Sequence, residues 1–128
     1  MEREKLEFDV LFVGAGPANL AGAIHLKKLA QAQGREVEVG MIEKAESIGA
    51  HSLSGAVLGP KALRELLPDY REKGCPIEGT DLRDGVFYLT AGGQYRLPYT
   101  PPYMHNEGCF TISLSKFCAW LATIAEES

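Results

Sequence analysis

An apolar run near the start of the chain breaks at two closely spaced glycines and then passes into a helical pattern. Residues 10–13 are typical of a buried strand. Residues 20–32 are rich in Ala and Leu and carry a broad apolar stripe, which predicts a helix. Val37, Val39 and Met41 then alternate with polar or small residues and predict a second strand. The pattern therefore predicts a strand–helix–strand unit at the start of the chain.

The remainder of the chain predicts shorter elements. A Gly-Pro pair opens a short helix that a second proline ends, and an Ala-Gly-Gly turn separates two β-rich runs. The tyrosines and prolines of residues 95–103 are expected to pack within this hairpin, with a ring-binding wall or a partner surface as the alternatives. In chain order we expect a helix (60–67), a polar loop (69–85), a β-hairpin (86–90 with 94–97), a strand (110–114) and a helix capped by Ser115 and ending at Glu127.

These elements predict one α/β domain. We expect a partial Rossmann-like βαβ core over about residues 8–58, an inserted helix, loop and β-hairpin over about 59–104, and a strand and C-terminal helix over about 109–127. A doubly wound sheet needs more parallel strands than the two predicted here. Some edge of the sheet is therefore expected to lie exposed.

The glycine turn has the chemistry of a phosphate-binding loop. Gly14 permits a sharp turn, and Gly16 has no side chain to hold a diphosphate away from the backbone. Pro17 suits the first helical turn, whose free N–H groups and positive dipole end would face the phosphates. Asn19 stands where the dinucleotide pattern has a third glycine. Its side chain must point aside, enlarge the helix–strand contact or donate near the phosphates; an ordinary strand-to-helix loop is the alternative for the whole turn.

Glu43 closes the second predicted strand. A carboxylate at that position can accept hydrogen bonds from both ribose hydroxyls of an adenosine and would repel a 2′-phosphate. This favours FAD or NAD over NADP, with a solvated strand-end carboxylate as the alternative.

Composition and charge exclude several classes of function. The 128 residues include 13 basic and 17 acidic side chains, a net charge of −4, and no basic stripe suggests a nucleic acid partner. No apolar run has the length of a transmembrane helix, and the N-terminus resembles neither a signal nor a transit peptide, so a cytoplasmic start is expected. The three widely spaced cysteines predict neither disulfides nor a metal site. His25 and His105 are assigned no chemistry, and no catalytic residue is predicted.

The segment after Glu43 is rich in glycine and hydroxyl groups, as expected of a loop that wraps a ligand or of a surface connector. Together with the turn and the acid, it resembles the electron transfer flavoprotein-ubiquinone oxidoreductase family. The similarity covers nearly the whole chain, and the family usually has glycine where Asn19 stands. The matching segments are residues 9–20, 42–44, 48–58, 60–63, 104–108 and 112–114.

The resemblance implies the N-terminal part of an FAD domain of the glutathione-reductase-like class. The whole enzyme would pass electrons from reduced electron transfer flavoprotein to ubiquinone, as a peripheral protein on the cytoplasmic side of a bacterial inner membrane. The ligands of the family's [4Fe-4S] cluster and its membrane-dipping segment lie in parts that this chain lacks. We therefore expect membrane contact only through those parts, and incomplete activity for this chain alone.

On this interpretation the FAD site combines the glycine turn, the strand-end acid and the following loop. Two alternatives stay open: a fragment of an N-hydroxylating flavin monooxygenase, which often has Gly-x-Gly-Pro-x-Asn, and a non-catalytic remnant or interaction module that no longer binds flavin. The run of residues 49–55 argues against the monooxygenase. The expected FAD contacts are Gly14, Ala15, Gly16, Pro17, Ala18 and Asn19 at the diphosphate, Glu43 at the ribose with Lys44 beside it, and Gly49, His51, Ser54 and Gly55 toward the flavin. The flavin ring would supply the redox chemistry, and no metal ligand is assigned.

Overall fold

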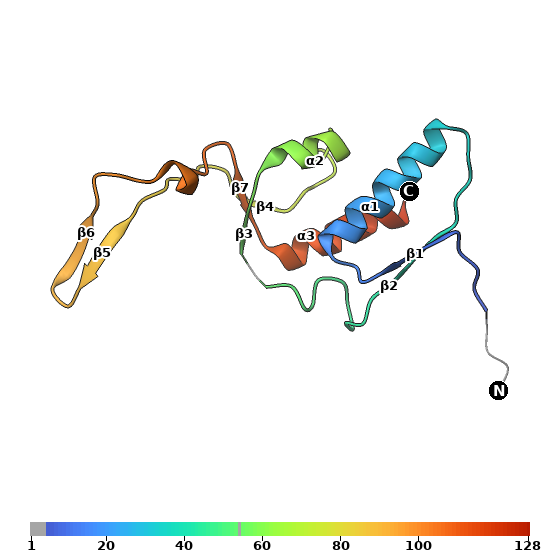
Figure 1. Ribbon diagram of the computed structural model, residues 1–128, viewed down its shortest axis with the longest axis horizontal. Coiled ribbons are helices and arrows are strands. Elements are labelled where there is room, and N and C mark those ends of the chain that lie inside the picture. Colours follow the sequence, from blue (N-terminus) through green and yellow to red (C-terminus); the bar gives the residue numbers. More distant parts are fainter. Residues whose placement is uncertain (1–4, 54) are drawn as a thin grey trace.

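The computed structural model describes residues 5–53 and 55–128 and has a mixed α/β architecture (Figure 1). Helices and strands are interleaved along the chain, and the strands form three separate small sheets. In chain order the elements are β1 (Val10–Val13), α1 (Pro17–Ala32), β2 (Val39–Ile42), β3 (Ala56–Leu58), α2 (Pro60–Leu66), β4 (Ile77–Gly79), β5 (Phe87–Thr90), β6 (Gly93–Arg96), a 3₁₀ turn (Pro102–Met104), β7 (Phe110–Ile112) and α3 (Leu114–Glu126).

The first sheet is the predicted strand–helix–strand unit. β1 and β2 run parallel in register, from Val10 opposite Val39 to Val13 opposite Ile42, and α1 connects them. The helix begins at Pro17, three residues earlier than predicted, because Gly16 is its extended N-cap and proline fits the first turn. β2 begins at Val39, two residues later than predicted at Val37. The predicted α/β class and the βαβ unit are therefore present.

A second, antiparallel sheet was not predicted. Its strand order is β3-β7-β4, with Ile112 of the central strand opposite Ala56 on one side and Ile77 on the other. The prediction of an unbroken loop over 69–85 is therefore wrong at β4, and the prediction for 48–58 lacked β3. Each of these strands has three residues, which is too short for a recognisable alternation, and their partners lie far away in the sequence.

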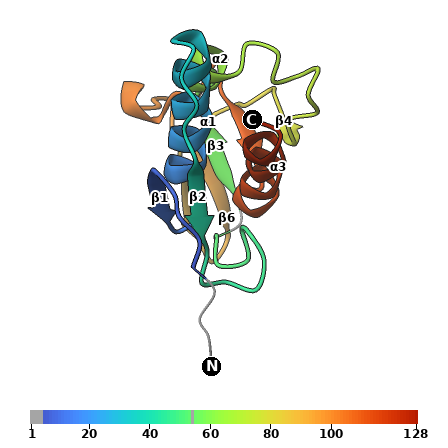
Figure 2. The same cartoon turned by 90° about the vertical axis from the view of Figure 1, so that its right-hand side faces the viewer.

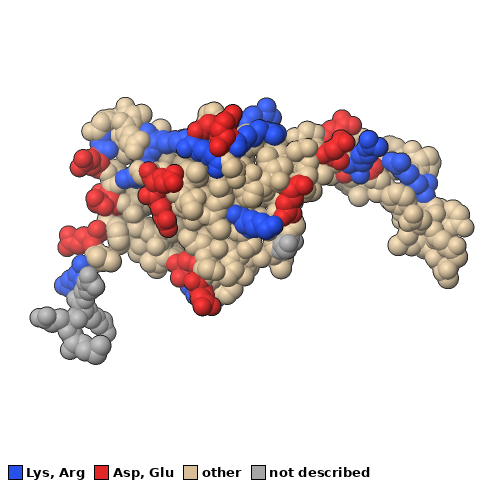
Figure 3. All heavy atoms as spheres, turned by 180° about the vertical axis from the view of Figure 1, so that it is seen from behind, with Lys and Arg blue, Asp and Glu red and all other residues tan. Residues whose placement is uncertain are grey.

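The β-hairpin is confirmed, but the packing predicted for its aromatic residues is wrong. β5 pairs with β6 from Phe87 opposite Arg96 to Thr90 opposite Gly93, and the hairpin projects far from the body of the protein (Figure 1). Tyr95, Tyr99 and Tyr103 are 61%, 65% and 87% exposed. The projecting end of the hairpin carries few charged side chains in Figure 3. Because the hairpin stands away from the core, the tyrosine rings have few neighbouring side chains to pack against.

The last helix forms the core together with α1. α3 begins at Leu114 with Ser113 as its N-cap, so the prediction of Ser115 as the cap is wrong; the Ser113 side chain is buried and makes no capping hydrogen bond. α1 and α3 pack against each other (Figure 2). The largest side chains fully buried in the core are Leu20, Ile24, Leu67, Phe110, Ile112, Cys118 and Leu121.

One face of the parallel sheet is largely uncovered, with the Phe8 ring lying against it at Gly40. Leu11, Val13 and Ile42 are 50%, 73% and 53% exposed, although parallel sheets are normally covered on both faces. Side chains alternate along a strand, so these residues point away from α1. The carboxyl ends of β1 and β2, where the candidate site lies, therefore border an open apolar surface.

Candidate functional site

The turn after β1 has the backbone geometry that a phosphate-binding loop requires. Gly14 has a φ of 96°, in the left-handed region that favours glycine, and its N–H donates to the Ile42 carbonyl at 2.7 Å. Gly16 is extended, with φ −77° and ψ 170°, and a Cβ added there would meet no atom within 4 Å. The backbone at Gly16 therefore faces open space at the start of α1.

Three backbone N–H groups at this turn are free to bind an anion. The first helical hydrogen bond of α1 runs from the Leu20 N–H to the Gly16 carbonyl at 3.0 Å. Within the described part of the chain, the N–H groups of Gly16, Ala18 and Asn19 donate to no protein acceptor. Pro17 has no N–H, and no side chain caps the helix. These donors and the positive end of the helix dipole are the ordinary components of an anion site.

Glu43 is held against the turn from the end of β2. Its Oε2 accepts the Ala15 N–H at 2.7 Å, and its Oε1 accepts the Ala45 N–H at 2.8 Å. The hydrogen bond from Ala15, then that from Ala45, lowers the pKa of the Glu43 carboxyl, with a smaller contribution from the charge of His51. The side chain is therefore a carboxylate at neutral pH and is oriented by two backbone donors.

The exposed Glu43 carboxylate can still accept further hydrogen bonds. An ionised carboxylate offers about four lone-pair positions on its two oxygens, and the two backbone donors occupy one on each. A vicinal diol can use the remaining positions. This arrangement allows Glu43 to hold the turn and a ribose at once.

Asn19 points back at the turn. Its Nδ2 donates to the Val13 carbonyl at 3.0 Å and to the Gly14 carbonyl at 2.8 Å. The three arrangements considered for this position did not include this one, in which the amide donates to carbonyls of the turn itself. In place of the third glycine of the dinucleotide pattern, this chain has an asparagine whose side chain bonds to the turn.

The loop after Glu43 is anchored on α3. Gly49 has a φ of 87°, and a Cβ there would lie 2.5 Å from the Ser115 carbonyl oxygen. The Ser52 hydroxyl lies 3.9 Å from the Cys118 sulfur, and burial raises the pKa of that thiol. Lys44, His51 and Gly55 are exposed, while Ser54 lies outside the described residues.

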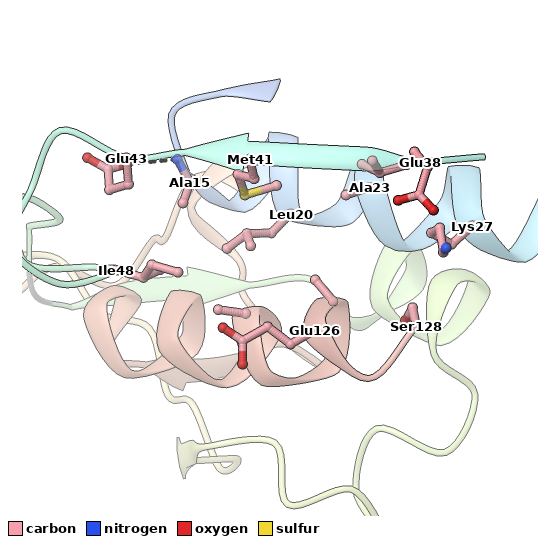
Figure 4. Close-up of a pocket in the computed structure, with 13 residues that line it drawn as sticks. Ala15, Leu20, Ala23, Lys27, Glu38, Met41, Glu43, Ile48, Glu126 and Ser128 are labelled. Carbon is pink, nitrogen blue, oxygen red and sulfur yellow. Dashed lines mark hydrogen bonds between the residues drawn. The ribbon is translucent and has the colours of Figure 1, made fainter. Parts of the chain in front are cut away.

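A cavity of about 370 Å³ lies beside the turn, between β2, α1 and α3 (Figure 4). Ala15 and Glu43 line one part of it, and Lys27 and Glu38 line another. The α3 residues that line it, such as Glu126, were not predicted, because the docking of α3 has no local signal in the sequence. The described residues contain no group of His, Cys, Asp and Glu side chains able to hold a metal, and none of their helices has the length and apolarity to span a membrane.

Sequence comparison relates the chain to proteins of one name. No protein-family model matches the chain. The electron transfer flavoprotein-ubiquinone oxidoreductase of Pseudomonas aeruginosa is 47% identical over 129 residues, which cover 98% of this chain and 23% of the relative. The chain is related to these oxidoreductases. The mitochondrial proteins of that name from Dictyostelium discoideum and Homo sapiens are 47% and 42% identical, over 97% and 98% of the chain.

The resemblance expected from the sequence is therefore confirmed, across bacteria and eukaryotes. The chain spans about a fifth of the length of the curated relatives it matches, with coverages of 23%, 20% and 21%.

Proposed function

We propose that this chain is an FAD-binding part of an oxidoreductase that passes electrons from reduced electron transfer flavoprotein to ubiquinone. The observation that carries the proposal is the junction of the glycine turn with Glu43: three free N–H groups lie beside a carboxylate that Ala15 and Ala45 hold in place. The printed names of the relatives supply the donor and the acceptor. Both partners are taken from the names of the relatives, which are several times longer than this chain.

The residues of this chain bind and orient the cofactor. The N–H groups of Gly16, Ala18 and Asn19 would hold the diphosphate, and Glu43 would accept the ribose hydroxyls. The Glu43 charge disfavours a 2′-phosphate, which supports FAD rather than NADP. Bound flavin would supply the redox chemistry, and the loop of residues 47–53, fixed on α3 through Gly49, would approach its ring.

The resemblance implies a [4Fe-4S] cluster for the full-length relatives, and the described residues of this chain offer no ligand set for it. Contact with the membrane surface is likewise proposed for the whole protein. The alternative of a non-catalytic module has one observation in its favour. The sheet face that carries Leu11, Val13 and Ile42 is exposed, so the described structure has no second layer packed on it. The two proposals differ in one measurable property, retention of flavin.

The first experiment measures flavin retention. The chain is expressed, freed of unbound flavin by gel filtration and scanned in the visible range; bound FAD should give the flavin absorption bands. Glu43→Ala should weaken FAD binding by about 1 to 3 kcal/mol, because it removes charge-assisted hydrogen bonds. Glu46→Ala, an exposed acid in the same loop, is the matched control and should bind as the wild type does. A folded, colourless protein with no affinity for FAD would favour the non-binding module.

A segment exchange tests the electron-transfer part of the proposal. This chain replaces the matching segment of the Pseudomonas aeruginosa relative, and the hybrid is assayed for quinone reduction by reduced electron transfer flavoprotein. We expect activity within about tenfold of the parent, since the two segments are 47% identical. A hybrid that binds FAD and reduces no quinone would contradict the assignment to this reaction.

A further inference from the structure

We propose that Asn19 is a positioning residue that fixes the two peptide groups around Gly14 and thereby presets the phosphate-facing turn. The starting observation is the pair of hydrogen bonds from its Nδ2 to the Val13 and Gly14 carbonyls, at 3.0 and 2.8 Å. These carbonyls belong to consecutive peptide groups, one on each side of the Gly14 Cα. A single side chain therefore restrains both.

The opposite ends of the same two peptide groups are bonded to β2 and to the residue that follows it. The Gly14 N–H donates to the Ile42 carbonyl at 2.7 Å, and the Ala15 N–H donates to Glu43 Oε2 at 2.7 Å. Each peptide group is thus held at its N–H by one strand end and at its C=O by Asn19. Four hydrogen bonds therefore fix the turn around Gly14. This residue has a φ of 96° and no side chain that would restrict its backbone.

This arrangement also determines which polar backbone groups of the loop are paired and which stay free. Carbonyl oxygens carry partial negative charge, and an unpaired carbonyl facing a diphosphate would repel it. Asn19 binds two of them, while the next N–H groups, of Gly16 and Ala18, stay free. The primary amide has two N–H hydrogens, and both are used within the turn. A direct Nδ2 contact with phosphate would require one of these bonds to break.

The assignment rests on the proposed function for its ligand, but its structural part can be tested without any ligand. Hydrogen exchange of the Gly14 and Ala15 amides is measured in the unliganded chain. Asn19→Ala and Asn19→Asp should each speed exchange of both amides by about fivefold, because the peptide group of each amide loses one hydrogen bond worth roughly 1 kcal/mol net. Asn106→Ala, which removes a distant asparagine that bonds to Asp84, is the control and should leave both exchange rates unchanged.

Binding of ADP, as a probe for the FAD diphosphate, completes the test. Asn19→Ala should weaken it by about three- to tenfold, and Asn19→Asp by more, since it places a negative charge beside the turn carbonyls and the phosphate. Weaker ADP binding with unchanged amide exchange in Asn19→Ala would overturn the assignment and make Asn19 a direct ligand. If the wild type binds no ADP while the variants speed exchange, the positioning role stands and the proposed function fails.

Discussion

Two glycines in the turn after β1 serve different purposes, although they lie two residues apart. Gly14 is needed for its left-handed φ of 96°, whereas Gly16 has an ordinary φ of −77° and open space around it. The first therefore supports the fold of the turn. The second leaves room for a ligand.

The paired variants Gly14→Ala and Gly16→Ala should separate these roles. Gly14→Ala should lower the free energy of unfolding by about 1 to 2 kcal/mol, the cost of a Cβ in the left-handed region. Gly16→Ala should leave stability within about 0.5 kcal/mol but weaken FAD binding, because its Cβ would occupy the phosphate side. Urea unfolding and FAD titration measure the two effects. A Gly16→Ala protein with full affinity would contradict the placement of the diphosphate.

The carboxylate of Glu43 gives stability a dependence on pH in the acid range. Its folded pKa is lowered by the hydrogen bonds from Ala15 and Ala45, so its contribution is complete above the ordinary pKa of a glutamate. That contribution is lost as the pH falls through the lowered folded pKa. Urea midpoints between pH 7 and pH 3 should therefore fall less steeply for Glu43→Gln than for the wild type. Parallel curves would show that the two hydrogen bonds do not favour the ionised form.

The sequence was most informative about the site at the residue scale, because the groups concerned are local. Gly14, Gly16 and Glu43 were singled out by their positions after strands, and the structure brings the turn and the acid together through the Ala15 N–H. The direction of the Asn19 side chain could not be predicted. Its acceptors are carbonyls of the turn itself, and these carbonyls are oriented by the bonding of the turn to β2.

At the scale of elements, α3 positions the loop that follows Glu43. Gly49 lies so close to the first turn of α3 that a Cβ would be 2.5 Å from the Ser115 carbonyl oxygen. Because the atoms that this Cβ would meet belong to the Ser115 backbone, no flexible side chain could move aside to make room. The loop is therefore fixed on α3 through a glycine.

A Gly49→Ala substitution should displace this loop. We expect a loss of about 1 to 3 kcal/mol in the free energy of unfolding, from the positive φ of 87° and the overlap together. The neighbouring Ala50→Ser, at an exposed position, should change stability by less than about 0.5 kcal/mol. Equal unfolding midpoints for Gly49→Ala and the wild type would show that the loop is not anchored there.

The elements that were predicted correctly carry their own signals. α1 has a clear apolar stripe between a glycine turn and a Gln-Gly exit, and the hairpin has strong β-formers on both sides of Ala-Gly-Gly. β3 and β4 have three residues each and pair with β7 over more than thirty positions of sequence, as with Ile77 and Ile112. Such strands are defined by tertiary pairing and not by local preference. The N-cap of α3 is the buried Ser113 and not the predicted Ser115.

At the scale of the whole molecule, the apolar face of the parallel sheet should promote self-association. Leu11, Val13 and Ile42 lie exposed on one side of two strands whose edges are unpaired in the described structure. Val13→Thr keeps the shape of the side chain but replaces one methyl group with a hydroxyl, at a position that is 73% exposed. Sedimentation velocity at several concentrations should show less association for this variant, with stability changed by less than about 0.5 kcal/mol.

The contrasting variant is Leu121→Ala in the core. Leu121 is 2% exposed, so its truncation should cost about 2 to 5 kcal/mol, without reducing association of the folded fraction. A Val13→Thr protein that associates as strongly as the wild type would show that this face is not the contact surface.

We propose that the junction of β1, α1 and β2 binds the adenosine diphosphate part of FAD. The most direct measurement is a titration of the ¹⁵N-labelled chain with FAD, ADP and FMN, followed by the amide resonances. We expect FAD and ADP to shift the resonances of Gly16, Ala18 and Asn19. FMN, which lacks the adenosine diphosphate, should not shift them at the same concentration, and Glu43→Ala should weaken both effects. Amide shifts confined to other parts of the chain, or none with any of the three ligands, would show that this junction is not the binding site.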